Sequence, residues 1–139
     1  MLLHIVARGK IGRSPEADLV DRYLHRITWP TRLSELAERG KLPELPSNSV
    51  RVVLDERGTA LTSTELAKTL EKWRDGGKRE ARFLIGAADG HAEEQRRSAD
   101  LLLSFGPATW PHLLVRAMLA EQLFRATSIL ANYPYHREG

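Results

Sequence analysis

The sequence contains no cysteine, and only 6% of its residues are aromatic. The absence of cysteine excludes a disulfide framework, a thiolate metal site and a cysteine nucleophile. It also suits a reducing cytosol, so we expect a cytoplasmic protein. No apolar run approaches the roughly 20 residues that cross a bilayer, and the chain starts apolar before it turns basic, the reverse of a secretory signal. We therefore expect no membrane partner.

Blocks of like charge and metal-binding motifs are missing as well. The net charge is +3, from 21 basic and 18 acidic residues, a balance that permits an acidic partner such as RNA without requiring one. The 5 histidines are scattered, and none belongs to an H-E-x-x-H motif. The sequence also has no G-x-S-x-G elbow, no G-x-G-x-x-G fingerprint and no P-loop. We expect neither a metal site nor a serine nucleophile.

What is present is the pattern of a folded α/β domain. A length of 139 residues matches one domain, and 42% hydrophobic with 28% charged residues is ordinary for such a domain. Short apolar runs alternate with helical patterns, which predicts a largely parallel sheet flanked by helices. The expected strands are 2–7, 32–37, 50–54, 82–85 and 101–105, and the expected helices are 15–27, 62–76, 92–99 and 111–132.

Capping residues mark two of these helices. Ser14 can cap the first helix, with Pro15 at its first position. Thr62 and Glu65 have the spacing of a capping box at the start of the second. The last helix is apolar over too wide an arc to lie on one sheet face. Part of its surface is therefore expected to pack against a second subunit, although full burial within one chain is the alternative.

Two loops follow predicted buried strands, where open α/β sheets place ligand crevices. Gly86 and Gly90 bracket the first loop and allow close approach of a ligand to the backbone. The second loop, 104–112, contains a glycine and two prolines, which fix an irregular backbone with peptide groups that must find water or a ligand. We expect the two loops to line one pocket. Each could equally be a connection that binds nothing.

The C-terminal tail gathers chemically versatile side chains. Tyr135, His136 and Arg137 can stack on a base, move a proton and neutralise developing negative charge. Chain ends usually carry little chemistry, so an inert tail is the alternative. Arg116 and its charged neighbours on the last helix allow three interpretations, as an exposed charge network, an interface or an RNA-facing surface.

Several segments together resemble one family. They are FLIG at 83–86 with Gly90, LSF at 103–105, WPHLLVR at 110–116, AEQLFRA at 120–126 and PYHR at 134–137. The chain resembles the RlmH-type large-subunit rRNA pseudouridine methyltransferases of the SPOUT class over essentially its whole length, most strongly in the last third. Two positions depart from the family pattern. Ala87 stands where the family usually has a second glycine, and Tyr133 where it often has a histidine.

The resemblance implies a fold and an activity. The fold would be a single-domain SPOUT fold over 1–139, with a C-terminal trefoil knot that generic topology rules would not predict. The activity would be transfer of a methyl group from S-adenosylmethionine to N3 of a pseudouridine in helix 69 of 23S rRNA, on the assembled ribosome, by a homodimer. The cofactor positions of the family map onto Leu54, Gly86, Phe105, Gly106, Pro107, Ala108, Thr109 and Trp110.

Methyl transfer from a sulfonium needs positioning more than a metal or a covalent intermediate. The proton on N3 must still be removed, and His136 has an intrinsic pKa in the useful range. Arg137 could bind the flanking carbonyl oxygens, and Tyr135 could stack on or orient the base. The sequence leaves open which group takes the proton. It also leaves two rival functions, a SPOUT enzyme acting on tRNA and a non-catalytic ribosome-associated RNA-binding module.

Overall fold

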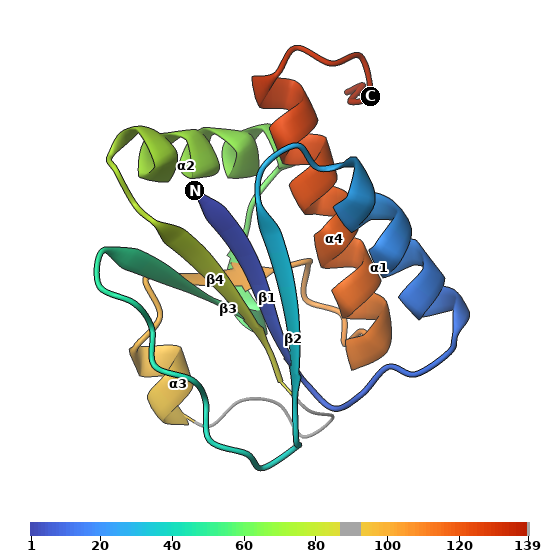
Figure 1. Ribbon diagram of the computed structural model, residues 1–139, viewed down its shortest axis with the longest axis vertical. Helices are drawn as coiled ribbons and strands as arrows, with labels where there is room; N and C mark the ends of the chain where they lie inside the picture. The colour runs from blue at the N-terminus through green and yellow to red at the C-terminus, as the bar shows by residue number, and fades with distance from the viewer. Residues whose placement is uncertain (87–92, 139) are drawn as a thin grey trace.

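The fold is a five-stranded sheet with helices packed against it (Figure 1). The computed structural model describes residues 1–86 and 93–138. The sheet has the order β2-β1-β4-β3-β5, and every pair of neighbouring strands is parallel. The elements are β1 (Leu2–Arg8), α1 (Pro15–Arg26), β2 (Thr31–Leu36), β3 (Ser49–Ala60), α2 (Ser63–Asp75), β4 (Glu80–Ile85), α3 (Glu93–Arg97), β5 (Leu101–Ser104) and α4 (His112–Leu130). The predicted parallel α/β architecture is confirmed.

The helix starts follow from their capping residues. The Ser14 hydroxyl accepts a hydrogen bond from the Ala17 amide, with Pro15 in the first turn of α1. Thr62 and Glu65 form the reciprocal capping box of α2. These bonds satisfy amides that a helix start leaves without intrahelical partners.

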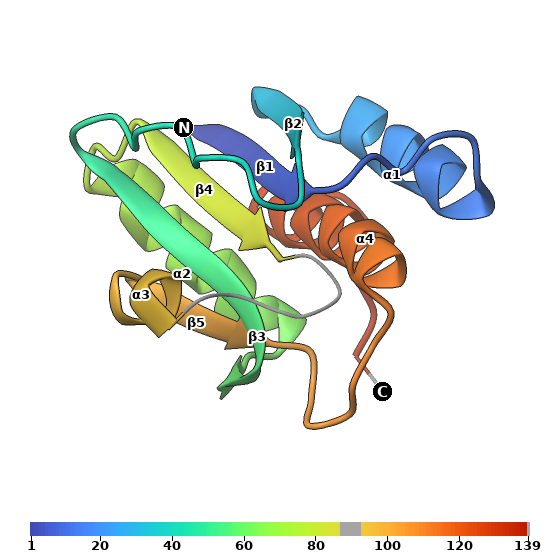
Figure 2. The ribbon, with the colours of Figure 1, turned by 90° about the horizontal axis from the view of Figure 1, so that it is seen from below.

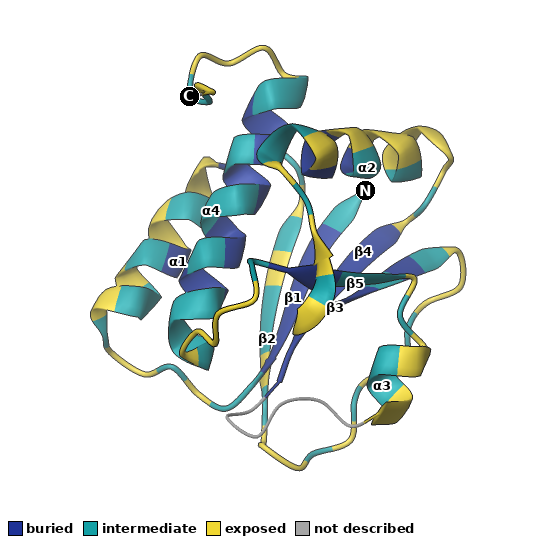
Figure 3. Ribbon diagram, turned by 180° about the vertical axis from the view of Figure 1, so that it is seen from behind, coloured by how far each residue is buried: buried dark blue, intermediate teal, exposed yellow. Residues whose placement is uncertain are grey.

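The main core lies on one face of the sheet, beneath α2 and α4 (Figure 3). Alternate residues of β1, β3 and β4, such as Ile5, Val52 and Phe83, are fully buried there because successive side chains of a strand point to opposite faces. Helix α1 packs beside α4 near the β2 edge, where Val20 meets Ala117 and Ala120. The opposite face has a smaller cluster around Val6, Val53 and Leu84.

Helix α4 is less uniformly buried than its composition suggested. Leu119, Leu123 and Phe124 are buried, whereas Leu114 and Met118 stay half-buried in this chain. The packing of α4 against a second subunit therefore remains a prediction.

In the described ranges, 1–86 and 93–138, no helix is both long and apolar enough to cross a membrane.

Strand β3 is the element that differs most from expectation. The sequence predicts an end at Leu54, but the strand continues to Ala60. Its pairing with β5 shifts register, with Leu54 and Thr59 both opposite Leu103. Residues 55–58 therefore lie outside the regular pairing of β3 with β5. Irregularities of this kind change the direction of side chains at the edge of a sheet. The expected boundary at Asp55 is wrong because this segment interrupts the strand without ending it.

Candidate active site

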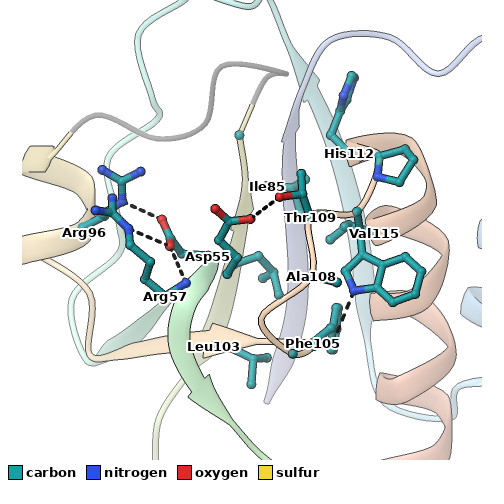
Figure 4. Close-up of a pocket in the computed structure, with 16 residues that line it drawn as sticks. Asp55, Arg57, Ile85, Arg96, Leu103, Phe105, Ala108, Thr109, His112 and Val115 are labelled. Carbon is teal, nitrogen blue, oxygen red and sulfur yellow. Dashed lines mark hydrogen bonds and ion pairs between the residues drawn. The ribbon is translucent and has the colours of Figure 1, made fainter.

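A cavity of about 590 Å³ lies where β3, β4 and β5 end and α4 begins (Figure 4). The carboxyl ends of parallel strands share one edge of the sheet, so the loops after them converge. Every residue mapped onto the family's cofactor positions lines this cavity except Pro107. Gly86 is at its wall, whereas Gly90 and Ala87 lie outside the described residues.

Side chains hold the irregular loop after β5 in shape. The Ser104 hydroxyl accepts from the Gly106 amide at 2.9 Å and lies 2.8 Å from the Gly106 carbonyl oxygen. Gly106 has a φ of 108°, a left-handed conformation that glycine adopts without steric cost. The Trp110 indole N–H donates to the Phe105 carbonyl at 3.4 Å. These bonds hold the loop after β5, which lines the cavity, in one backbone conformation.

The interrupted part of β3 adds charged groups that sequence reasoning missed. Asp55, Glu56 and Arg57 line the cavity, together with Arg96 from α3. The Asp55 carboxylate accepts from Arg96 Nε at 2.5 Å and from the Arg57 amide at 2.8 Å. Burial alone would raise the pKa of Asp55, but these hydrogen bonds outweigh it and leave the pKa below its usual value. Asp55 is therefore ionised at neutral pH.

Glu56 faces the loop after β5. Its carboxylate accepts a hydrogen bond from the Thr109 hydroxyl at 2.7 Å, as Figure 4 shows. The bond ties the interrupted strand to the opposite wall of the cavity. Two acidic residues directly after a predicted strand could have indicated that Asp55 and Glu56 belong to the site. Their placement at the cavity wall, however, depends on the register shift between β3 and β5.

The C-terminal tail folds back onto α4. The Tyr135 ring packs edge-on against Phe124 at 4.6 Å between centroids, and its hydroxyl donates to Glu121 at 3.2 Å. The Arg125 guanidinium lies 4.7 Å from the Tyr135 ring centroid. Burial, with a hydrogen bond involving Tyr23 and the charge of Glu121, raises the pKa of Tyr135 to about 12. Tyr135 is therefore protonated at neutral pH and serves as a donor.

His136 also contacts Arg125. Its Nδ1 lies 3.1 Å from an Arg125 Nη1, and because a guanidinium can only donate, Nδ1 is the acceptor. Nε2 lies 3.5 Å from a carboxylate oxygen of Glu138. Arg125 also pairs with Glu121 at 2.6 Å, while Arg137 is exposed. The tail thus has one ordered imidazole and one accessible guanidinium.

The tail and the cavity lie at opposite ends of α4. His112 and Val115 line the cavity, whereas Arg125 contacts His136. Arg125 is 13 residues beyond His112 in the helix, which corresponds to about 20 Å. Among the described residues, no hydrogen bond or ion pair joins Tyr135, His136 or Arg137 to a residue that lines the cavity. A second hollow of about 600 Å³ between α1 and α4 shares Phe105 and Gly106 with the cavity.

Arg116 is a correction to the sequence interpretation. The sequence places this arginine on a surface or an interface, but its side chain is fully buried. It pairs with Glu35 at 2.5 Å and donates to the Gly9 carbonyl at 3.1 Å. Burial of this charge is possible because a carboxylate and a peptide oxygen replace water around it.

Comparison with known proteins agrees with this arrangement of elements and site. The family described as "Predicted SPOUT methyltransferase" matches residues 1–136. The chain belongs to the RlmH-type SPOUT methyltransferases. Similar proteins named "Ribosomal RNA large subunit methyltransferase H" come from Rhizorhabdus wittichii, at 68% identity, and from Novosphingobium aromaticivorans, at 66%. Both alignments cover 100% of this chain and 100% of the relative.

A solved structure shares the fold of this SPOUT methyltransferase. A probable methylase family protein from Haemophilus influenzae superposes with a TM-score of 0.61 at 11% sequence identity. The match covers 98% of this chain and 70% of the other. At this identity the likeness concerns the arrangement of strands and helices alone. It supports the α/β architecture described above.

Proposed function

We propose that this SPOUT methyltransferase transfers a methyl group from S-adenosylmethionine to N3 of a pseudouridine in helix 69 of 23S rRNA on the assembled ribosome. The observation that carries the proposal is the convergence of residues 54, 86, 105, 106 and 108–110 on one cavity. The names of the relatives, which act on large-subunit ribosomal RNA, support the substrate. Ribosomes as substrate would place the enzyme in the cytoplasm.

The residues of the cavity fit this cofactor. A volume of about 590 Å³ is in the range of small-molecule sites. Leu54, Leu103 and Val115 supply apolar walls suited to an adenine ring, and the peptide groups of 105–110 suit its polar edges. The carboxylate of Glu56 is a negative charge that favours a nearby sulfonium, whereas the charge of Asp55 is compensated by Arg96 and Arg57. When bound, the cofactor supplies an electrophilic methyl group on sulfur.

The protein must hold the base and accept its proton. Tyr135 is unsuited to proton removal because its pKa is about 12, so we assign it to orienting the base. We assign the proton from N3 to the imidazole of His136. Its Nδ1 becomes free when Arg125 turns fully to Glu121, with which it already pairs. The exposed Arg137 then binds the carbonyl oxygens beside N3, where negative charge develops.

A homodimer is part of the proposal. The tail of this chain contacts Glu121, Phe124 and Arg125 and not the first turn of α4, which lines the cavity, so we infer that a second subunit supplies the tail that meets each cavity. The half-buried Leu114 and Met118 line the hollow between α1 and α4 and offer an apolar surface for that subunit. We also infer that the C-terminal third forms the trefoil knot, on the basis of family membership.

Calorimetric titration with S-adenosylmethionine tests the cofactor assignment. Ala108→Phe places a ring in the cavity and is expected to weaken binding by at least about tenfold, or 1.4 kcal/mol. Pro107→Ala is the matched control, since Pro107 is in the same loop but does not line the cavity, and binding should stay within about twofold. If the wild-type protein gives no heat with the cofactor or its demethylated product, the assignment fails.

The substrate is tested by presenting ribosomes, free 23S rRNA and tRNA side by side with labelled cofactor. We expect label in 23S rRNA from assembled ribosomes only. Label in tRNA would favour the rival SPOUT activity. Cofactor binding without label in any RNA would contradict the proposed reaction, and ribosome binding without cofactor binding would favour the non-catalytic module.

A further inference from the structure

Two loops at one edge of the sheet carry exposed cations. Lys10 and Arg13 lie in the segment between β1 and α1, and Arg39 and Lys41 lie in the segment that follows β2. Among residues 1–86 and 93–138, these side chains make no hydrogen bond or ion pair with another described group. Because parallel β1 and β2 end side by side, the loops lie next to each other. We call Lys10, Arg13, Arg39 and Lys41 the basic edge.

Arg8 fixes the second loop to the first strand. Its Nη1 donates to the carbonyl oxygens of Ala37, at 3.2 Å, and Gly40, at 2.6 Å. The Gly9 amide donates to the Leu36 carbonyl at 2.7 Å. These bonds hold the start of the loop that carries Arg39 and Lys41 against the end of β1.

The buried Arg116 fixes the first loop to α4. It bonds both Glu35 and the Gly9 carbonyl, and the same Glu35 oxygen accepts from the Ile11 amide at 2.8 Å. Gly9 and Gly12 have positive φ values of 88° and 62°, which let the segment turn here. Figure 2 shows this segment passing beside the first turns of α4. Those turns also line the cofactor cavity through His112 and Val115.

The acidic side chains near the basic edge are Glu16 and Asp18 in the first turn of α1 and Glu38 and Glu44 in the segment after β2. Glu38 is exposed and lies between the end of β2 and the cations Arg39 and Lys41. The charge of Glu35 is neutralised by Arg116. Exposed, unpaired cations that are fixed in spacing suit a regularly spaced polyanion, because binding releases condensed counterions without reorganising the protein. Their attachment to the same helix turns as the cavity would align such a polyanion with the site of chemistry.

We propose that the basic edge binds the phosphate backbone of the RNA substrate and thereby sets the approach of the target base to the cavity. The proposal rests on the proposed RNA methyltransferase function and adds the surface that holds the RNA. Arg8, Glu35 and Arg116 act as positioning residues, since they fix the two loops without facing the RNA themselves.

Neutralising the cations in pairs tests the proposal. The variants are Lys10→Gln with Arg13→Gln, and Arg39→Gln with Lys41→Gln. The matched control is Lys72→Gln with Arg79→Gln, two exposed cations near the opposite, amino-terminal edge of the sheet. Binding of a labelled helix 69 hairpin and of purified ribosomes is measured over a series of salt concentrations, together with methylation kinetics.

For each basic-edge variant we expect weaker binding and a shallower salt dependence. The slope of log affinity against log salt should fall by about 0.7 for each phosphate that the variant no longer neutralises. KM should rise about tenfold, with kcat and the calorimetric affinity for S-adenosylmethionine within about twofold of wild type. The control pair should leave all five quantities within about twofold of wild type.

Unchanged affinity and slope in both basic-edge variants would overturn the proposal, as would an equal loss in the control pair, which indicates a general charge effect. Loss of ribosome binding with hairpin binding intact would assign the surface to an acidic protein instead. A wild-type protein without cofactor heat or methylation contradicts the proposed function and is therefore distinguishable from failure of the basic edge alone.

Discussion

His4 illustrates how a buried polar residue is satisfied in this protein. Its Nδ1 bonds the Glu80 carboxylate at 3.0 Å, and its Nε2 accepts from the Ser34 hydroxyl at 2.8 Å. Arg82 bonds the same Glu80 oxygen at 2.7 Å and also donates to the carbonyls of Pro43 and Glu44. Burial lowers the pKa of His4, and the bond to Glu80 only partly offsets this. The native state therefore keeps the imidazole neutral.

This neutral histidine predicts an acid-sensitive stability. The unfolded chain protonates His4 near its ordinary pKa of 6.5, whereas the folded chain does so only at lower pH. Between the lowered pKa of the folded state and 6.5, the unfolded state binds more protons than the folded state. The free energy of unfolding therefore falls as the pH drops through this interval. Urea unfolding between about pH 7.5 and 5.5 measures the loss. His4→Asn keeps a donor toward Glu80 but cannot titrate, and should lose less stability over this range. An identical pH dependence in both proteins would contradict the assignment.

At the scale of single elements, the interrupted strand β3 shapes the cavity. Residues 55–58 leave the ladder, and this places Asp55 and Glu56 at the cavity wall. Gly58 makes this path possible, because a Cβ there would overlap the Leu102 carbonyl on the neighbouring strand. A close approach of two backbones thus explains why glycine occupies this position.

Gly58→Ala is therefore expected to destabilise the protein by about 1–3 kcal/mol, the usual cost of overpacking. Separation of β5 from β3 should also weaken cofactor binding, since both strands contribute to the cavity. Gly40→Ala is the control, because a Cβ at that position makes ordinary contacts of 3.5 Å with Ala37. Urea midpoints and calorimetric titration measure both effects. Equal stability of the two variants would show that β5 accommodates the methyl group.

At the scale of the whole molecule, the tail and the cavity contact different parts of α4. The first turn of α4 lines the cavity, and the tail contacts Glu121, Phe124 and Arg125 farther along the same helix; Figure 1 shows the C-terminus beside the end of α4. A dimer is part of the proposed chemistry, and we expect sedimentation at micromolar concentration to show one. A monomer that still methylates RNA would contradict a shared site.

Mixing two inactive variants tests the shared site directly. A chain truncated after Asn132 lacks the tail, and Ala108→Phe blocks the cavity. In a mixed two-fold dimer, one intact cavity meets one intact tail, so equal mixing should restore about a quarter of wild-type activity. The two variants must be unfolded and refolded together, with each variant refolded alone as the control. No recovery, despite mixed dimers in sedimentation, would place the whole site in one chain.

The order of strands and helices and two helix caps could be predicted from local pattern, because periodicity and capping depend on residues close in sequence. The two strand-end loops could be singled out for the same reason, and the resemblance supplied seven of the residues that line the cavity. The burial of Arg116 could not be predicted, since its partner Glu35 is 81 residues away. The roles of Asp55 and Glu56 depend on a register shift against β5, and the basic edge depends on β1 and β2 ending side by side. Contacts between distant segments decide these features, and only the tertiary structure specifies such contacts.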